Sequence, residues 1–177
     1  MDAKRVELPL AQQEMPSLRL GESLLLNGTL YTARDAAHAR LVALLAAGTP
    51  LPIPPGACIY YTGPCPAAPG EVIGPCGPTT SARMNRYTPP LIDYGVTALI
   101  GKGPLGQDAR AALKGRGVYL AATGGAGVLL ARRVRSSRLI AFPELGAEAV
   151  YEWQVQDFPV IVATDIHGRS LFDSPRP

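Results

Sequence analysis

The stretch VTALIGKGPLGQDARAALKGRGVYLAA, residues 96–122, decides the fold class of this chain. Two apolar runs, Val96 to Ile100 and Val118 to Ala122, are typical of buried strands, and Gly106 to Lys114 between them has the pattern of a short helix. A strand, a helix and a second strand in succession indicate parallel pairing with helical cover. The stretch therefore predicts an α/β fold.

The same alternation continues on both sides of this stretch. On the N-terminal side, a helix ending near Gly48 separates two apolar runs, and Thr32 is its expected N-cap. On the C-terminal side we expect a helix from Gly124 to Arg133, strands at Leu139 to Phe142, Ala149 to Val155 and Pro159 to Ala163, and a last short strand through Leu171 and Phe172. Because no linker or repeat interrupts the pattern, we expect a single domain over residues 1–177, with a mixed sheet and helical cover.

The composition excludes several classes of protein. With 177 residues, 47% hydrophobic and 18% charged, the chain is long and apolar enough for a core of its own. The N-terminus has no apolar signal region and no segment could span a bilayer, so we predict a cytoplasmic protein without a membrane partner. The basic cluster Arg132 to Arg138 contains no aromatic residues. We therefore interpret it as a solvated helix end rather than a nucleic-acid patch.

Three cysteines, Cys58, Cys65 and Cys76, lie around a loop rich in Gly and Pro. Their odd number and the missing signal peptide argue against a disulfide framework. There is no C-x-x-C pair, and His38 and His167 are the only histidines. We therefore expect buried or loop thiols, and no metal site made by this chain alone.

Two glycine-rich loops resemble nucleotide-binding loops but lack their spacing. The loop from Ala121 to Gly127 has no G-x-G-x-x-G pattern, and we interpret it as tight packing between a strand and a helix. Gly101-Lys102-Gly103 lacks the Walker spacing. A lysine between two glycines at the end of a strand can nevertheless reach a ligand, so Lys102 is a candidate binding residue.

The segment Gly77-Pro-Thr-Thr-Ser-Ala-Arg-Met84 places three hydroxyl groups and a guanidinium where a loop is expected to enter a helix. Pro78 suits the first helical position, and the amides of Thr79 to Ser81 would then point outwards and favour an anion. On a helix Thr79 and Arg83 would share a face. The pattern is that of a carboxylate site with a proton-transfer group, or alternatively of a capping cluster.

Four segments carry a resemblance to a known family, in the same order along nearly the whole chain. They are similar to segments of the β-subunit of class I fumarate hydratases and of the related L(+)-tartrate dehydratase: Gly28 to His38, Gly77 to Met84, Ala98 to Gly103 and Tyr151 to Pro159. The resemblance implies a swivelling β/β/α domain that docks on a separate α-subunit carrying a 4Fe–4S cluster. The expected assembly is an α2β2 complex or a homodimer of β-chains.

The resemblance also implies a reaction and roles for residues. The reaction is the reversible hydration of fumarate to L-malate, in which the partner's iron holds the leaving hydroxyl. Thr79 falls on the position of the base, and the implied substrate-binding set is Arg34, Arg83, Lys102, His38 and Thr80. A threonine needs help to act as a base, which the helix N-terminus, Arg83 and Lys102 would give. On pattern alone, Arg34 and His38 are also compatible with ordinary surface residues.

Some positions depart from the family pattern and keep other interpretations open. Ala82 stands where members often have an aromatic residue, and Asn85 where they have an acid. The choice between fumarate and tartrate is therefore open. A binding or regulatory module that has lost catalysis, and a stand-alone nucleotide-binding enzyme, are the alternatives from other classes. Cys76 lies beside the motif and could approach a cluster held by the partner.

Overall fold

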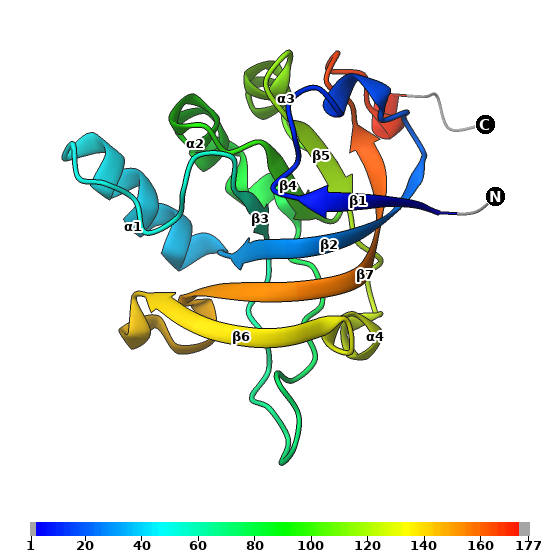
Figure 1. Cartoon of the computed structure of the whole chain (residues 1–177). Coiled ribbons are helices and arrows are strands. Elements are labelled where there is room, and N and C mark those ends of the chain that lie inside the picture. The colour runs from blue at the N-terminus through cyan, green and yellow to red at the C-terminus, as the bar shows by residue number, and fades with distance from the viewer. Residues whose placement is uncertain (1–2, 174–177) are drawn as a thin grey trace.

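The structure, a computed structural model, describes residues 3–173 as one mixed sheet with helices on its outside (Figure 1). The strands are β1 Lys4–Leu8, β2 Ser23–Thr32, β3 Cys58–Tyr60, β4 Ala98–Gly101, β5 Val118–Ala121, β6 Val134–Ala141 and β7 Val150–Thr164. The α-helices are α1 Asp35–Ala46, α2 Thr88–Tyr94, α3 Gln107–Leu113 and α4 Gly127–Ala131. The 3₁₀-helices are η1 Met15–Ser17, η2 Ser81–Tyr87, η3 Pro143–Glu148 and η4 Leu171–Asp173.

Five of the strands close into a barrel. Strands β2, β3, β4 and β5 are parallel neighbours, and β7 pairs antiparallel with both β5 and β2. Strand β1 extends the sheet along β2, and β6 extends it along β7 (Figure 1). The predicted α/β class, with a mixed sheet and helical cover, is confirmed. The parallel order also brings the carboxyl ends of β2, β3 and β4 to one rim of the barrel.

Strands β3, β4 and β5 are buried on both faces. Residues such as Tyr60, Ile100 and Leu120 belong to a cluster inside the barrel, while their neighbours belong to a second cluster with the helices. The second cluster includes Ile59 and Leu99 from the strands and the apolar faces of α1, α2 and α3. This two-sided burial explains why β3, β4 and β5 have continuous apolar sequences.

The two segments predicted as separate strands at 149–155 and 159–163 form one strand, β7. A local irregularity at Asp157, whose φ is 51°, lies opposite a register shift near Gly28 in β2. Asp157 N–H donates to Asn27 Oδ1 at 3.0 Å across this joint. Gly28 has a φ of 105°, and a Cβ there would lie 2.5 Å from the Leu8 carbonyl oxygen. The bulge lets a long strand bend around the barrel without ending.

Several predicted boundaries are wrong. Thr32 is the last residue of β2 rather than an N-cap, because its Oγ1 accepts the N–H of Tyr151 at 3.1 Å and ties β2 to β7. Leu171 lies in the 3₁₀-helix η4 instead of a strand, and β1 has no counterpart in the sequence prediction. The helix expected up to Arg133 ends at Ala131. Within residues 3–173 no helix has the length and apolar character needed to cross a membrane.

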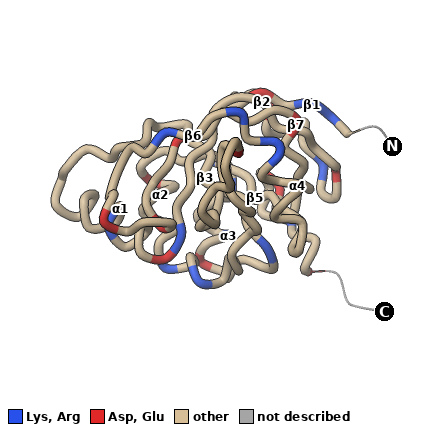
Figure 2. Tube along the Cα trace, turned by 90° about the horizontal axis from the view of Figure 1, so that it is seen from below, with Lys and Arg blue, Asp and Glu red and all other residues tan. Residues whose placement is uncertain are grey.

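The basic cluster after α4 lies partly in a turn, at Arg132 and Arg133, and partly in β6. Arg135 and Arg138 lie in β6, so the predicted helix end is wrong for them. Arg138 donates to Glu152 Oε1 at 2.8 Å, and Arg135 Nε donates to Gln156 Oε1 at 3.0 Å. Basic and acidic positions are interspersed along the trace in Figure 2. These arginines therefore have partners on the neighbouring strand.

Candidate functional site

The segment from Gly77 to Met84 crosses the carboxyl ends of β3 and β4. Thr79 N–H donates to Tyr61 O at 2.6 Å, and Lys102 N–H donates to Thr79 O at 3.3 Å. Ser81 N–H donates in turn to Lys102 O at 2.9 Å. Thr80 and Lys102 are thereby paired in a parallel β-bridge. The segment extends the sheet by one rung and puts Thr79 and Thr80 beside Lys102.

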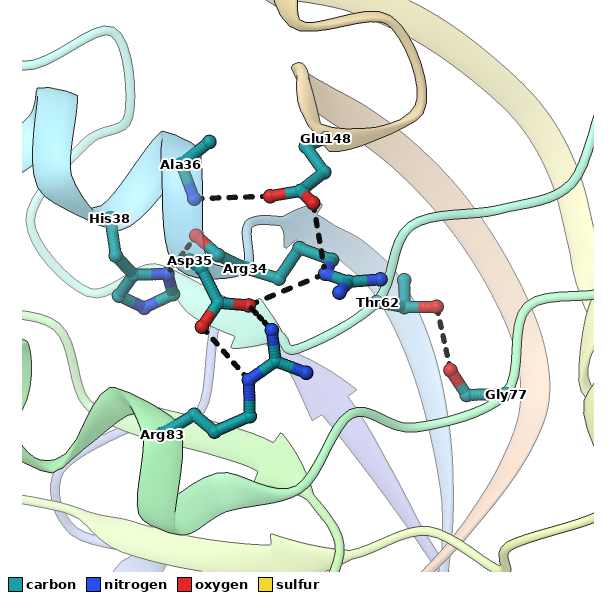
Figure 3. A network of polar contacts seen from close by, with 8 residues as sticks. All are labelled: Arg34, Asp35, Ala36, His38, Thr62, Gly77, Arg83 and Glu148. Atoms are coloured by element: carbon teal, nitrogen blue, oxygen red, sulfur yellow. Dashed lines mark hydrogen bonds and ion pairs between the residues drawn. The ribbon is translucent and has the colours of Figure 1, made fainter.

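Side chains fasten this segment to the barrel. Ser81 is buried, and its Oγ is hydrogen-bonded to Tyr119 OH at 2.8 Å. Tyr119 OH donates to Gly103 O at 2.7 Å, so Ser81 is the donor in the first bond. Thr62 Oγ1 donates to Gly77 O at 2.8 Å (Figure 3). The hydroxyl of Ser81, the third one in the motif, therefore has a structural role.

The predicted helix start is wrong. The helical part, η2, is a 3₁₀-helix that begins at Ser81, so Pro78 does not occupy a first helical position. The N–H groups of Thr79 and Ser81 point to carbonyl groups instead of outwards. Thr79 lies before the helix, so the prediction that Thr79 and Arg83 share a helix face is wrong. The segment does not start a helix here because the carbonyl groups of Tyr61 and Lys102 are free at the rim. Backbone N–H groups that leave water need such acceptors, so those of Thr79 and Ser81 bind them.

Two arginines at the rim form ion pairs with acids of this chain. Arg83 Nε lies 3.0 Å from Asp35 Oδ1, and Arg83 Nη2 lies 2.7 Å from Asp35 Oδ2 (Figure 3). Arg34 Nε lies 3.5 Å from Asp35 Oδ2 and 3.4 Å from Glu148 Oε1. Glu148 Oε2 accepts the N–H of Ala36 at 3.0 Å, in the first turn of α1. The arginines are thus held by carboxylates from α1 and η3.

His38 lies beneath this network without exposed surface. Its Nδ1 is 3.0 Å from Arg34 O, and because a carbonyl only accepts, Nδ1 carries the proton. Its ring meets Tyr61 edge-on at 5.1 Å and lies 5.8 Å from the ring of Tyr87. Burial lowers the pKa of His38 to about 4, so the ring is neutral near pH 7. In this conformation His38 supports the backbone of Arg34 rather than facing solvent.

Lys102, Thr80 and Thr79 have the exposure that ligand-binding groups need. Lys102 and Thr80 are exposed and Thr79 is half-buried. No Asp or Glu within residues 3–173 forms an ion pair with Lys102. A Cβ at Gly124 would lie 3.8 Å from Lys102 Cδ, so the glycine loop after β5 runs beside the lysine stem. This cation is therefore available to an anion.

The structure thus places the sequence-predicted residues in two groups on one rim. Thr79, Thr80 and Lys102 sit at the ends of β3 and β4, while Arg34, His38 and Arg83 sit on α1 and η2. The sequence prediction missed the acids Asp35 and Glu148 as members of the site. Asp35 had a signal in its position next to Arg34, but Glu148 is remote in sequence and had none.

None of the three thiols belongs to the ion-pair network, although Cys76 directly precedes the Gly77–Met84 segment. Cys58 and Cys76 are buried and Cys65 is exposed. Burial raises the pKa of Cys58 and of Cys76 to about 12, which keeps both thiols protonated. In the part of the chain that the structure describes, no three His, Cys, Asp or Glu side chains are grouped so that they could hold a metal ion. These residues therefore do not fit an iron–sulfur cluster, which needs thiolate ligands.

Comparisons with known proteins match this chain over nearly its whole length. The family model described as Fumarase C-terminus matches residues 1–175. Fumarate hydratase 2 of Leishmania major is 35% identical over 176 residues, which are 97% of this chain and 31% of that protein. The anaerobic class I fumarate hydratase of Escherichia coli is 37% identical over 153 residues, 84% of this chain and 28% of that protein. The chain therefore spans about a third of these two relatives.

A shorter relative matches over most of both chains. The putative L(+)-tartrate dehydratase subunit beta of Methanocaldococcus jannaschii is 38% identical over 172 residues. The match covers 93% of this chain and 88% of that protein.

Proposed function

The chain belongs to the fumarase C-terminal family, and from this membership we propose that it acts as the β-subunit of a hydro-lyase that reversibly hydrates fumarate to L-malate. The observation that carries the proposal is the rim itself. Three cations, Arg34, Arg83 and Lys102, lie on one rim of the barrel with the hydroxyl of Thr79. A four-carbon dicarboxylate substrate needs cations for its carboxylates and a group that moves a proton at one of the two carbons between them.

Lys102 is the cation on which proton transfer by Thr79 depends in this proposal. A threonine hydroxyl is a weak base unless a neighbouring charge stabilises its alkoxide. The backbone amides of Thr79 and Ser81 do not supply that charge, because they donate to carbonyl groups. Arg83 forms an ion pair with Asp35, so its charge is already partly neutralised. Lys102 is hydrogen-bonded to Thr79 through the backbone and has no acidic partner within residues 3–173. We propose that its ammonium group lowers the cost of ionising Thr79, and that Thr80 helps to hold the substrate.

Arginine suits the carboxylate-binding part of this proposal. A guanidinium meets a carboxylate with two parallel N–H···O bonds, which fixes the orientation of the bound acid. Arg83 is half exposed and Arg34 about a quarter exposed, so both retain surface toward a ligand. His38 contributes through Arg34, because it holds the carbonyl group of that residue.

We propose that a separate α-subunit holds a 4Fe–4S cluster, since the described residues of this chain do not fit one. When bound, such a cluster supplies a Lewis acid for the hydroxyl that leaves or enters. The name of the Methanocaldococcus relative, a subunit beta, supports the partnership. We further propose that this domain swivels against the α-subunit, in an α2β2 complex or as a β-chain homodimer, in the cytoplasm.

Dehydration of L(+)-tartrate is the second candidate, because a relative that matches over most of both chains is named as a putative tartrate dehydratase subunit. Tartrate has one hydroxyl more than malate, so the residues around the motif decide between the two. Asn85 Oδ1 accepts the N–H of Gly106 at 2.9 Å and is therefore turned toward α3. Ala82 is exposed and leaves space where a larger side chain would stand.

The test is an anaerobic reconstitution with the candidate α-subunit, assayed with fumarate, L-malate and L(+)-tartrate. Thr79→Ala should lower kcat by about a hundredfold or more, the usual contribution of a proton-transfer group, while the two subunits still co-purify. Lys102→Met should lower kcat as well. Thr49→Ala, in the exposed loop after α1, is the control and should leave kcat unchanged. A wild-type complex that turns over none of the three acids would sink the proposal, and normal kcat in Thr79→Ala would remove the role of this residue.

A further inference from the structure

The carboxylate of Asp35 lies between the two arginines of the rim. We propose that Asp35 is a positioning residue that orients Arg83, and with it Arg34, for binding the carboxylate group of the substrate. This inference rests on the proposed function and deepens it. It assigns a role to an acid in a site that otherwise attracts anions.

The Asp35–Arg83 pair combines one hydrogen bond with a second ion-pair contact. One carboxylate oxygen faces Arg83 Nε at 3.0 Å and the other faces Nη2 at 2.7 Å. The hydrogen bond at Nε and the charge contact at Nη2 act on the same edge of the guanidinium, so together they limit its orientation. The Asp35 side chain is 32% exposed, so the pair is partly shielded from water. The rotation of the Arg83 head is therefore restricted before any ligand arrives.

The pair leaves one end of the guanidinium open. Asp35 occupies the edge formed by Nε and Nη2, and no partner of Nη1 is found among residues 3–173. In Figure 3 this third nitrogen of Arg83 points to the side on which Thr62 and Gly77 lie. The terminal nitrogens of Arg34 point to the same side. Asp35 thus uses the inner edge of the group and leaves the outer end to a ligand.

Asp35 also keeps two like charges close together. Arg34 Nε lies 3.5 Å from the same Oδ2 that Arg83 Nη2 approaches at 2.7 Å. Without a negative charge between them, the two guanidinium groups would repel each other at this separation. Glu148 holds the other side of Arg34 at 3.4 Å and accepts the N–H of Ala36, which anchors the start of α1. The two arginines are thereby kept on one rim.

If Asp35 were a competitor of the substrate rather than a positioning residue, its removal would change KM in the opposite direction. If Asp35 competed with the substrate for Arg83, its removal would free the guanidinium and lower KM. If Asp35 positions Arg83, its removal would let both arginine side chains move and raise KM. Because the substrate is already bound in the step that kcat measures, kcat should change much less than KM in the positioning case.

The experiment uses the reconstituted complex and steady-state kinetics with the dicarboxylate that the wild type turns over. Asp35→Ala and Asp35→Asn should raise KM on the order of tenfold, which corresponds to the loss of one charge-assisted hydrogen bond to the substrate, with kcat within about twofold. The asparagine variant keeps the size of the side chain, so it reports if the alanine variant fails to fold. Asp93→Ala removes the exposed partner of Arg116 and should leave KM unchanged.

A double-mutant cycle shows whether Asp35 acts through Arg83. In an Arg83→Ala background, Asp35→Ala should raise KM by less than about threefold, because the group that it orients is absent. An unchanged or lowered KM in Asp35→Ala and Asp35→Asn overturns the inference, as does full additivity with Arg83→Ala. A wild-type complex without hydro-lyase activity overturns the proposed function and this inference with it. An active wild type with unaltered Asp35 variants overturns the inference alone.

Discussion

Replacing Gly101 by alanine should loosen the contact between the Gly77–Met84 segment and the barrel. Gly101 is the last residue of β4, and a Cβ built on it would lie 2.0 Å from Ser81 Oγ and 2.8 Å from Tyr61 Cδ2. Neither neighbour has room to yield, since both side chains are fully buried. Ser81 Oγ could move only by breaking its 2.8 Å hydrogen bond with Tyr119. The substitution therefore combines a steric clash with the loss of a buried bond.

The two contributions give the expected magnitude. Overpacking a well-packed core by one methyl group costs about 1–3 kcal/mol, and a buried hydrogen bond contributes about 0.5–1.5 kcal/mol. Gly101→Ala should thus lower the free energy of unfolding by about 2–4 kcal/mol. In a domain of this size that corresponds to a fall in Tm of roughly 5–15 °C. Urea denaturation of the purified chain, followed by circular dichroism, measures the change.

A second substitution isolates the clash. Ser81→Ala removes the oxygen, and its own cost should be about 1 kcal/mol for the lost hydrogen bond. In that background Gly101→Ala should cost about half as much as in the wild type, because the clash with Tyr61 remains. Gly77→Ala, in the same segment but with no atom within 4 Å of the new Cβ, is the control and should change stability by less than about 1 kcal/mol. A wild-type-like Gly101→Ala, or strict additivity with Ser81→Ala, would refute the packing argument.

Two further predictions concern buried titratable groups. Burial lowers the pKa of His38 to about 4, below the ordinary 6.5, so the unfolded chain takes up this proton first as the pH falls. The free energy of unfolding should therefore drop by on the order of 3 kcal/mol between pH 6.5 and 4 from this group, and a His38→Gln variant with the same pH dependence as the wild type would contradict this. Cys65 is exposed while burial raises the pKa of Cys58 and of Cys76 to about 12. A thiol reagent should label Cys65 alone in the folded chain and all three cysteines in urea, and rapid labelling of all three without urea would contradict the placement.

The parts of the fold that the sequence predicted are those with a local cause. The runs from Val96 to Ile100 and from Val118 to Ala122 are apolar because β4 and β5 are buried on both faces, inside the barrel and under the helices. A strand that is buried on both faces has a continuous apolar sequence, and this pattern can be recognised without knowing which strand it pairs with. Helix α3 likewise begins and ends within a residue of its predicted bounds.

The parts that the sequence did not predict depend on distant partners. Strand β1 is short, and only its parallel pairing with β2 at Leu24 to Gly28 makes it a strand. Strand β7 looks like two strands because Asp157 and Pro159 interrupt its pattern, but the bulge opposite Gly28 carries it through. Closure of the barrel by β7 is likewise a long-range pairing, for which local periodicity carries no signal.

The residues of the candidate site likewise fall into those that the sequence predicted and those that it missed. The cations and hydroxyls stood out as unusual residues next to turns, and the structure brings them to one rim. Their carboxylate partners did not, because Glu148 comes from the far end of the chain and Asp35 resembled an ordinary acid in the first turn of a helix. The motif was also expected to start a helix, whereas the carbonyl groups at the end of β4 draw its backbone into a β-bridge.

The charges at the rim support the proposal that a partner subunit completes the site. Arg34, Arg83 and Lys102 are positive, whereas Asp35 and Glu148 are negative and lie within ion-pair distance of the arginines. Three cations against two carboxylates leave a single positive charge, while a dicarboxylate ligand carries two negative ones. Exposed cations attract an anionic ligand only weakly in water, because the high dielectric constant and dissolved salt screen the attraction. Tight binding of the proposed dicarboxylate would therefore require further positive charge and exclusion of water from this rim, and the proposed partner subunit could provide both.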